Sequence, residues 1–300
     1  MHRRQFLKTT PVLLGMSLEG MPDHFWKTKP LLSFSTLGCP KWTFEQIIRC
    51  AAENGYQGIE IRGLQGQLDL PKCPEFSTPE RIAATLRLVE DHQLQIVNLG
   101  ASAQMHHADP VKRKTQMDEA KRFIDLAGRL RCPHIRVFPD DLPKDQDENT
   151  TIDLIIDGLV ELGNYARGSG VSVLLESHGK VVRSDLLLRI MQGANHPQVG
   201  LVWDVFNIWS VTKEPPKKVF RTLRKYIAHV HIKDATFAGG KSRYVLLGQG
   251  EAPIRHAVRA LSKGGFKGYY SFEWEKMWHP DIQEPEVAIP HYPQEILSYF

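Results

Sequence analysis

The sequence has little cysteine, no long apolar run and almost no excess of one charge, and each shortage excludes a class of protein. Its four cysteines include no CxxC pair, which excludes a zinc ribbon, and we expect reduced thiols that serve packing. No stretch reaches the ~20 apolar residues that a membrane-spanning helix needs. The formal net charge of +4 on 300 residues is too small for a nucleic-acid-binding surface.

The composition is that of an ordinary globular protein. Hydrophobic residues make up 42% of the chain and charged residues 24%, which excludes a disordered or fibrous protein. A chain of this length can form one α/β barrel of roughly 250 residues or two domains of ordinary size. No expected strand is followed by a GxGxxG that opens a helix, which argues against a dinucleotide-binding, doubly wound sheet.

Residues 1–25 differ from the rest of the chain. Arg3 and Arg4 precede the tripeptide 6–8, Phe-Leu-Lys, and a short apolar stretch follows at 11–16. This arrangement resembles a bacterial twin-arginine export signal, although Glu19 interrupts the apolar stretch and an ordinary basic tail is the alternative. We therefore expect a leader over 1–25, a barrel over 26–300, and a periplasmic or envelope-associated protein, or a cytoplasmic one if the leader is only a tail.

From residue 31 onward, short apolar runs alternate with amphipathic segments. The predicted strands are 31–37, 58–62, 95–100, 134–138, 171–178, 199–206, 229–234 and 269–275. Helices are predicted over 44–55, from 79 onward, and over 111–131, 151–167, 184–194, 216–228 and 253–263. Eight strand-then-helix units predict a single (β/α)8 TIM barrel.

Acidic residues and a histidine mark the last four predicted strands at their carboxyl ends. These residues are Glu176, Asp204, His231 and Glu273. In a barrel the carboxyl ends of all strands meet at one mouth, where three carboxylates would repel one another without a cation. The sequence therefore predicts one bound divalent metal, and oxygen-rich ligation with one nitrogen suits Mn²⁺, Mg²⁺ or Co²⁺, with Zn²⁺ as a further choice.

Four strand-end motifs together carry a family resemblance. In chain order they are LLESHG at 174–179, VWDVFN at 202–207, HVHIKD at 229–234 and SFEWE at 271–275. With the opening segments 37–40 and 55–62, they resemble the xylose isomerase-like TIM-barrel superfamily, in its sugar-phosphate isomerase/epimerase branch. The resemblance covers roughly residues 31–290. It implies that Glu176, Asp204, His231 and Glu273 bind the metal, with Mn²⁺ as the first choice.

The resemblance also implies a reaction. A metal-dependent isomerase or epimerase would act on a keto-sugar or sugar derivative, with Glu176 and Glu273 transferring protons through a cis-enediolate. Two alternatives are a metal-dependent lyase or dehydratase acting on a keto-sugar or 3-keto-glycoside, as in inosose dehydratase, and a non-catalytic sugar-binding barrel. A related nuclease is disfavoured, because no histidine lies three residues after Asp204 and the segment 233–238, directly after His231, contains no second histidine.

The expected partner is a small-molecule sugar, with no nucleic acid and no membrane span, and a homo-oligomer is left open. The predicted substrate-binding residues are His178, Asn207, Lys233, Arg62 and Arg136, the two arginines having a structural ion pair as their alternative. Specificity is expected in the loops after the first three strands, to which we assign Trp42, Glu60, Asn98, His106 and His107.

Overall fold

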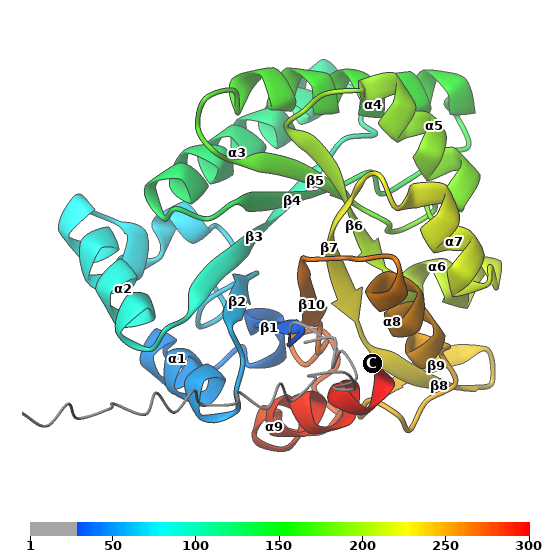
Figure 1. Cartoon of the computed structure of the whole chain (residues 1–300). Helices are drawn as coiled ribbons and strands as arrows, with labels where there is room; N and C mark the ends of the chain where they lie inside the picture. The colour runs from blue at the N-terminus through cyan, green and yellow to red at the C-terminus, as the bar shows by residue number, and fades with distance from the viewer. Residues whose placement is uncertain (1–28) are drawn as a thin grey trace, which may run out of the picture.

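Eight parallel strands close into a barrel in the computed structural model, which describes residues 29–300. The expected leader therefore lies outside the described residues. The barrel strands are β1 (Leu31–Ser35), β2 (Gly58–Ile61), β3 (Gln95–Gln104), β4 (His134–Phe138), β5 (Ser172–Glu176), β6 (Val199–Asp204), β7 (Ile227–Ile232) and β10 (Tyr269–Phe272). They pair in chain order, and β10 closes the barrel against β1 (Figure 1). The predicted (β/α)8 TIM barrel is confirmed.

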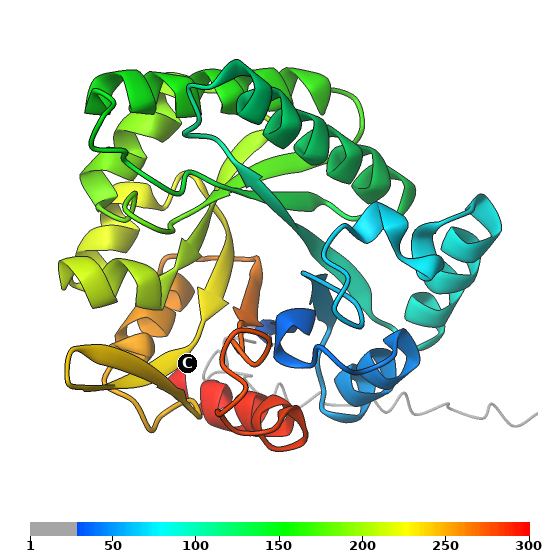
Figure 2. The same cartoon turned by 180° about the vertical axis from the view of Figure 1, so that it is seen from behind.

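Helices surround this barrel (Figures 1 and 2). They are α1 (Phe44–Glu53), α2 (Pro79–Asp91), α3 (Pro110–Arg129), α4 (Glu148–Tyr165), α5 (Ser184–Ala194), α6 (Val205–Thr212), α7 (Pro216–Leu223), α8 (Ile254–Lys263) and α9 (Pro285–Ile296). Helix α1 begins at a capping box. The Thr43 side chain accepts a hydrogen bond from the backbone N–H of Gln46, and the Gln46 side chain accepts one from the backbone N–H of Thr43. None of the helices formed by residues 29–300 is long and apolar enough to span a membrane.

The end of the sixth predicted strand is wrong. The apolar run 199–206 was expected to stay extended, but β6 stops at Asp204, and α6 begins at the next residue. The Asp204 carboxylate caps that helix, because its Oδ1 accepts from the backbone N–H of Asn207 at 2.7 Å. Asp204 therefore lies where strand and helix meet, and its second oxygen, Oδ2, lies 2.8 Å from Lys233 Nζ.

An antiparallel hairpin follows β7, in a segment where no strands were predicted. It consists of β8 (Asp234–Ala238) and β9 (Lys241–Val245). The Asp234 carboxylate holds its base, since it accepts backbone N–H groups from Gly248, Gly250 and Ala252 at 3.0–3.2 Å. The hairpin projects beside the carboxyl end of the barrel (Figure 1). Its Tyr244 ring centroid lies 5.8 Å from Lys233 Nζ, which belongs to the site described below.

Candidate active site

Four side chains from neighbouring strands meet at the carboxyl end of the barrel. Glu176 ends β5, Asp204 ends β6, His231 lies in β7 and Glu273 follows β10 directly. One potential ligand atom from each lies within 4.8 Å of all the others, and each residue is no more than 4% exposed. The structure thus brings together the whole predicted metal-binding set, here called the acid cluster.

The acid cluster fits a divalent cation. Within residues 29–300, three of its atoms are buried without a hydrogen bond: Glu176 Oε2, Asp204 Oδ2 and His231 Nδ1. Their charged neighbours lie at ion-pair distance, Arg136 at 3.0 Å, Lys233 at 2.8 Å and Glu273 at 3.2 Å. A bound cation would give all three atoms a ligand bond. Carboxylate oxygens with one imidazole nitrogen form a donor set suited to Mn²⁺, Mg²⁺, Co²⁺ or Zn²⁺.

Lys233 lies against one side of the acid cluster. Its Nζ is 2.8 Å from Asp204 Oδ2, 2.5 Å from Glu273 Oε2 and 2.7 Å from Glu275 Oε1. Burial alone would lower the pKa of Lys233, but these three carboxylates raise it well above its usual value. Burial raises the pKa of Asp204 to about 7, in spite of the opposing effect of Lys233. Glu275 contacts the lysine but does not belong to the four-residue set.

Arg136 contacts the acid cluster at Glu176, whereas Lys233 contacts it at Asp204 and Glu273. Its Nε lies 3.0 Å from Glu176 Oε2, and both side chains are 2% exposed. The guanidinium also donates to the carbonyl of Ala101 and stacks on Phe138 at 3.8 Å. Of the two alternatives for Arg136, the structure shows the buried ion pair, and contact with substrate stays a prediction.

Arg62 differs from Arg136 because no carboxylate among the described residues pairs with it. It is 6% exposed, and it donates to the carbonyl of Gly100 and to Ser102 Oγ. Burial and the neighbouring Arg136 lower its pKa to about 10. Gly100 makes room for both guanidiniums, since a Cβ there would lie 2.6 Å from Arg62 Cδ and 3.0 Å from an Arg136 nitrogen. A guanidinium without a counter-ion is suited to binding an oxygen-rich ligand.

His178 and Asn207 border the acid cluster on its more exposed side. The His178 side chain is 39% exposed, and its Nδ1 lies 3.0 Å from Asp140 Oδ1. Burial lowers the pKa of His178, but the hydrogen bond to Asp140 and the nearby Glu176 raise it overall. Asn207 Nδ2 donates to the carbonyl of Ser177, so this amide also holds the end of β5. Contact of either residue with substrate stays a prediction.

Asp140 is a neighbour of the site that the sequence did not reveal. It follows β4 with a φ of +64°, a conformation that non-glycine residues seldom adopt. Its carboxylate accepts from Gln104 as well as contacting His178. A positive φ leaves no trace in residue spacing, so no pattern in the sequence points to it.

Two residues assigned to specificity loops lie inside strands instead. Glu60 belongs to β2 and Asn98 to β3, and both are fully buried. The assignment was wrong because side chains alternate along a strand: Ile59 and Ile61 pack outward against the helices, which turns Glu60 into the barrel. That alternation was readable in the segment 58–61 and would have identified Glu60 as an interior carboxylate.

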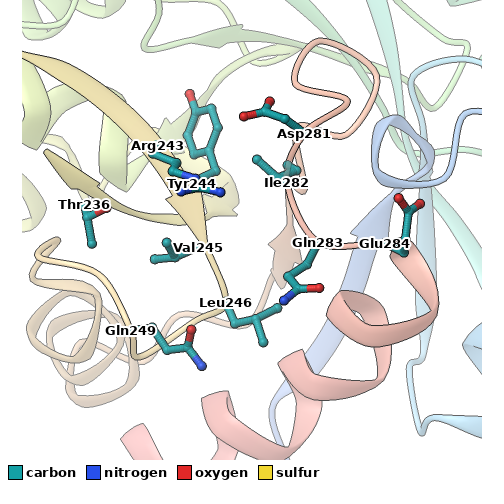
Figure 3. Close-up of a pocket in the computed structure, with 10 residues that line it drawn as sticks. All are labelled: Thr236, Arg243, Tyr244, Val245, Leu246, Gln249, Asp281, Ile282, Gln283 and Glu284. Carbon is teal, nitrogen blue, oxygen red and sulfur yellow. The ribbon is translucent and has the colours of Figure 1, made fainter. Parts of the chain in front are cut away.

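A pocket of about 360 Å³ lies between the β8–β9 hairpin and the loop after β10 (Figure 3). Its lining residues are Thr236, Arg243, Tyr244, Val245, Leu246, Gln249, Asp281, Ile282, Gln283 and Glu284. Tyr244 connects this pocket with Lys233, since its ring centroid lies 5.8 Å from Lys233 Nζ. Figure 3 shows the Asp281 carboxylate turned toward this tyrosine.

The comparison with known families agrees with this geometry. The sequence profile of the family described as xylose isomerase-like TIM barrel matches residues 48–291. The chain belongs to the xylose isomerase-like TIM-barrel family. The resemblance inferred from the strand-end motifs is therefore confirmed.

Individual members of this family are only distantly similar to the chain. Fructoselysine 3-epimerase from Shigella flexneri is 24% identical over 266 residues, which cover 84% of this chain and 91% of that protein. The 3-dehydroshikimate dehydratase of Bacillus anthracis is 23% identical over 198 residues, 65% of this chain and 68% of the relative. The crystal structure of the IOLI protein with a zinc atom shares the fold, with a TM-score of 0.76 at 20% identity, and the match covers 90% of this chain and 97% of that one.

Proposed function

We propose that this protein is a divalent-metal-dependent isomerase or epimerase that acts on a keto-sugar or sugar derivative. The observation that carries the proposal is the placement of two glutamates at the same nitrogen of one imidazole. Glu176 Oε1 and Glu273 Oε1 lie 3.7 and 3.2 Å from His231 Nδ1. The similarity to an epimerase that acts on a sugar derivative supports the same reading.

Glu176, Asp204, His231 and Glu273 would hold the metal, with Mn²⁺ as our first choice. A divalent cation at this position would supply Lewis-acid polarisation of a substrate carbonyl, which acidifies the neighbouring C–H bond. Glu176 and Glu273 would have distinct tasks as an acid–base pair. One glutamate, as the carboxylate, would accept the proton from carbon, and the other, as the carboxylic acid, would give its proton to the opposite face of the cis-enediolate, which inverts the centre and leaves the two protonation states exchanged.

The surrounding cations would bind the sugar and hold the glutamates. Arg136 fixes Glu176 in one orientation through its contact at 3.0 Å. Arg62 has a buried guanidinium without a carboxylate partner among the described residues, so it is the best placed to bind a substrate oxygen. Lys233 directly after β7, His178 after β5 and Asn207 in α6 border the same space.

A second candidate, a lyase or dehydratase, is favoured by one specific observation. His178 stands two residues after Glu176, and Asp140 supports it from behind at 3.0 Å. A histidine held by a carboxylate can donate a proton to a departing hydroxyl or alkoxyl group, whereas epimerisation has no leaving group. The similarity to a dehydratase agrees with this alternative.

One experiment separates these functions. Metal-loaded protein is incubated with a panel of ketoses and 3-keto-glycosides in D₂O, and NMR follows loss of C–H signal and the products. Epimerisation predicts deuterium at the inverted carbon, elimination predicts an unsaturated product, and a sugar-binding barrel predicts neither. Glu176→Gln and Glu273→Gln should each lower the rate by a factor on the order of 10² or more.

Glu275→Gln is the matched control, because Glu275 contacts Lys233 but lies outside the acid cluster. We expect it to retain metal content and most of the turnover. Asp204→Asn and His231→Ala should abolish stoichiometric Mn²⁺ binding, measured by elemental analysis. Full metal content in both of these variants would remove the metal site from the proposal.

We further propose that residues 1–25 direct export through the twin-arginine route, which carries folded proteins. A barrel that closes around Mn²⁺ before export avoids competition from Cu²⁺ and Zn²⁺, which bind most sites more tightly. Cell fractionation of the native protein beside a variant with Arg3→Lys and Arg4→Lys tests this. A native protein that stays cytoplasmic at full length would show that the segment is an ordinary tail.

A further inference from the structure

A single buried carboxylate connects two histidines below the acid cluster. Glu60 lies on β2, and its Oε2 is 2.8 Å from His229 Nε2 and 2.9 Å from His231 Nε2. All three side chains are no more than 1% exposed. The two histidines lie on β7, across the barrel interior from β2.

The chemistry of this contact fixes where the protons are. A carboxylate oxygen accepts hydrogen bonds, so each Nε2 that faces it must carry the hydrogen. In a neutral imidazole only one nitrogen is protonated, and a hydrogen at Nε2 leaves a lone pair at Nδ1. In His231 that second nitrogen is the one that faces Glu273 and Glu176, at 3.2 and 3.7 Å. Without a metal these carboxylates hold a hydrogen on Nδ1 as well, and a bound cation would take the place of that hydrogen.

We propose that Glu60 is a positioning residue, which holds His231 with Nε2–H toward β2, so that Nδ1 faces the acid cluster and is the nitrogen that would bind a cation. This inference rests on the proposed metal site and adds a residue that never touches the metal. A carboxylate behind a ligating histidine fixes its ring orientation and tautomer, and losing such a partner typically lowers metal affinity 10- to 100-fold.

The neighbouring contacts explain why Glu60 itself stays in place. His229 donates to the same oxygen and points to no carboxylate of the acid cluster, so its role is to hold Glu60. His231 in turn lies between two carboxylate systems, one at each ring nitrogen. Without Glu60, either of its nitrogens could carry the hydrogen, and an Nδ1–H would oppose a cation.

The first test needs no variant. Long-range ¹H–¹⁵N NMR of the metal-free protein reports the tautomer of each histidine, and the His231 signals are assigned by their loss in His231→Gln. We expect His231 Nε2 to carry a hydrogen, with Nδ1 protonated as well where it faces the carboxylates without a metal. A His231 Nε2 without a hydrogen in the native protein would overturn the proposal, whatever the protein does with metal.

The second test compares Glu60→Leu with Glu60→Gln and His229→Gln. Leucine removes both hydrogen bonds and should lower Mn²⁺ affinity 10- to 100-fold, measured by competition with a fluorescent chelator. Glutamine keeps one acceptor oxygen and should give a smaller loss, as should His229→Gln, which keeps the bond to His231. Native-like affinity in a folded Glu60→Leu protein, or an equal loss in all three variants, would contradict positioning.

These tests distinguish failure of the proposed metal site from failure of the proposed role of Glu60. If the native protein binds no divalent metal, the metal site is wrong, but the tautomer measurement still decides whether Glu60 orients His231. Circular dichroism and thermal unfolding check that each variant is folded. If Glu60→Leu does not fold, the graded losses in Glu60→Gln and His229→Gln carry the comparison.

Discussion

Replacing Lys233 with Met tests how the negative charge of the acid cluster is compensated when no metal is bound. The Lys233 side chain is 2% exposed, and its ammonium lies within 2.8 Å of oxygens from Asp204, Glu273 and Glu275. Methionine has a similar volume but no charge, so these carboxylates lose their nearest cation. Breaking a buried ion pair by removing one partner costs about 3–5 kcal/mol, because the other charge stays buried without compensation.

That loss translates into a measurable temperature shift. For a large domain, each 1 kcal/mol lowers the unfolding midpoint by about 2 °C, so we expect a fall of about 6–10 °C in chelator-treated protein. Adding Mn²⁺ should stabilise Lys233→Met more than the native protein, because the cation then compensates oxygens that the ammonium no longer neutralises. Circular dichroism at rising temperature measures both effects.

Lys180→Met is the matched control. Lys180 and Asp141 form an ion pair of similar length, 2.7 Å, but their side chains are 55% and 44% exposed. Exposed pairs contribute about 0–1 kcal/mol, so the unfolding midpoint of this variant should hardly change. If Lys233→Met loses no more stability than Lys180→Met in the metal-free protein, the charge balance argued here is wrong.

Three further predictions concern stability, each measured by urea unfolding. Thr43→Ala removes the acceptor for the Gln46 N–H in the capping box and should cost about 1 kcal/mol. Gly58→Ala places a Cβ 2.5 Å from Val97 Cγ1 and should cost about 1–3 kcal/mol, whereas Gly128→Ala, whose Cβ meets nothing closer than 3.9 Å, should not destabilise. Burial and His229 lower the pKa of His134 to about 4; the unfolded chain therefore takes up a proton below pH 6.5 that the folded one refuses. Relative to His134→Gln, the native protein should lose up to about 1.4 kcal/mol per pH unit between pH 6.5 and 4, and parallel pH profiles would contradict this.

Most of the barrel could be predicted from hydrophobic periodicity because its elements are locally consistent. The predicted strand 134–138 and the predicted helix 184–194 match β4 and α5 residue for residue. In both segments the apolar spacing, the turn residues and the final packing favour the same conformation. The predicted boundaries are wrong where tertiary contacts determine the conformation, as at the end of β6.

Helix α9 shows why one element could not be predicted. It contains Pro290 and Pro293, and prolines inside a segment argue against a helix. Pro293 has no N–H to offer the carbonyl of Ile289, four residues earlier. Tyr56 supplies the missing donor, since its hydroxyl donates to that carbonyl at 2.7 Å. The compensation comes from a residue 233 positions away, which no local pattern reveals.

One part of the candidate site could be predicted from the sequence and another part could not. The acid cluster could be predicted because barrel topology alone brings the ends of β5, β6, β7 and β10 to one mouth. Its surroundings could not, because they depend on which atoms meet. The expected contact of Lys233 with substrate stays a prediction, and its contacts with three carboxylates follow from no pattern in the sequence. Residue type and strand position predict a ligand set, whereas the partners of each ligand follow from side-chain geometry.

That geometry makes the two proposed acid–base glutamates unequal. Glu176 pairs with Arg136, whose guanidinium is fixed by a hydrogen bond to Ala101 and by stacking on Phe138. Glu273 pairs with Lys233, whose flexible ammonium is shared with two other carboxylates. A planar, permanently charged guanidinium holds its partner in one orientation, while a lysine can move to another acceptor. Glu273 is therefore the carboxylate that can change partner as substrate and cation enter, and Glu176 is the one held in place while it does so.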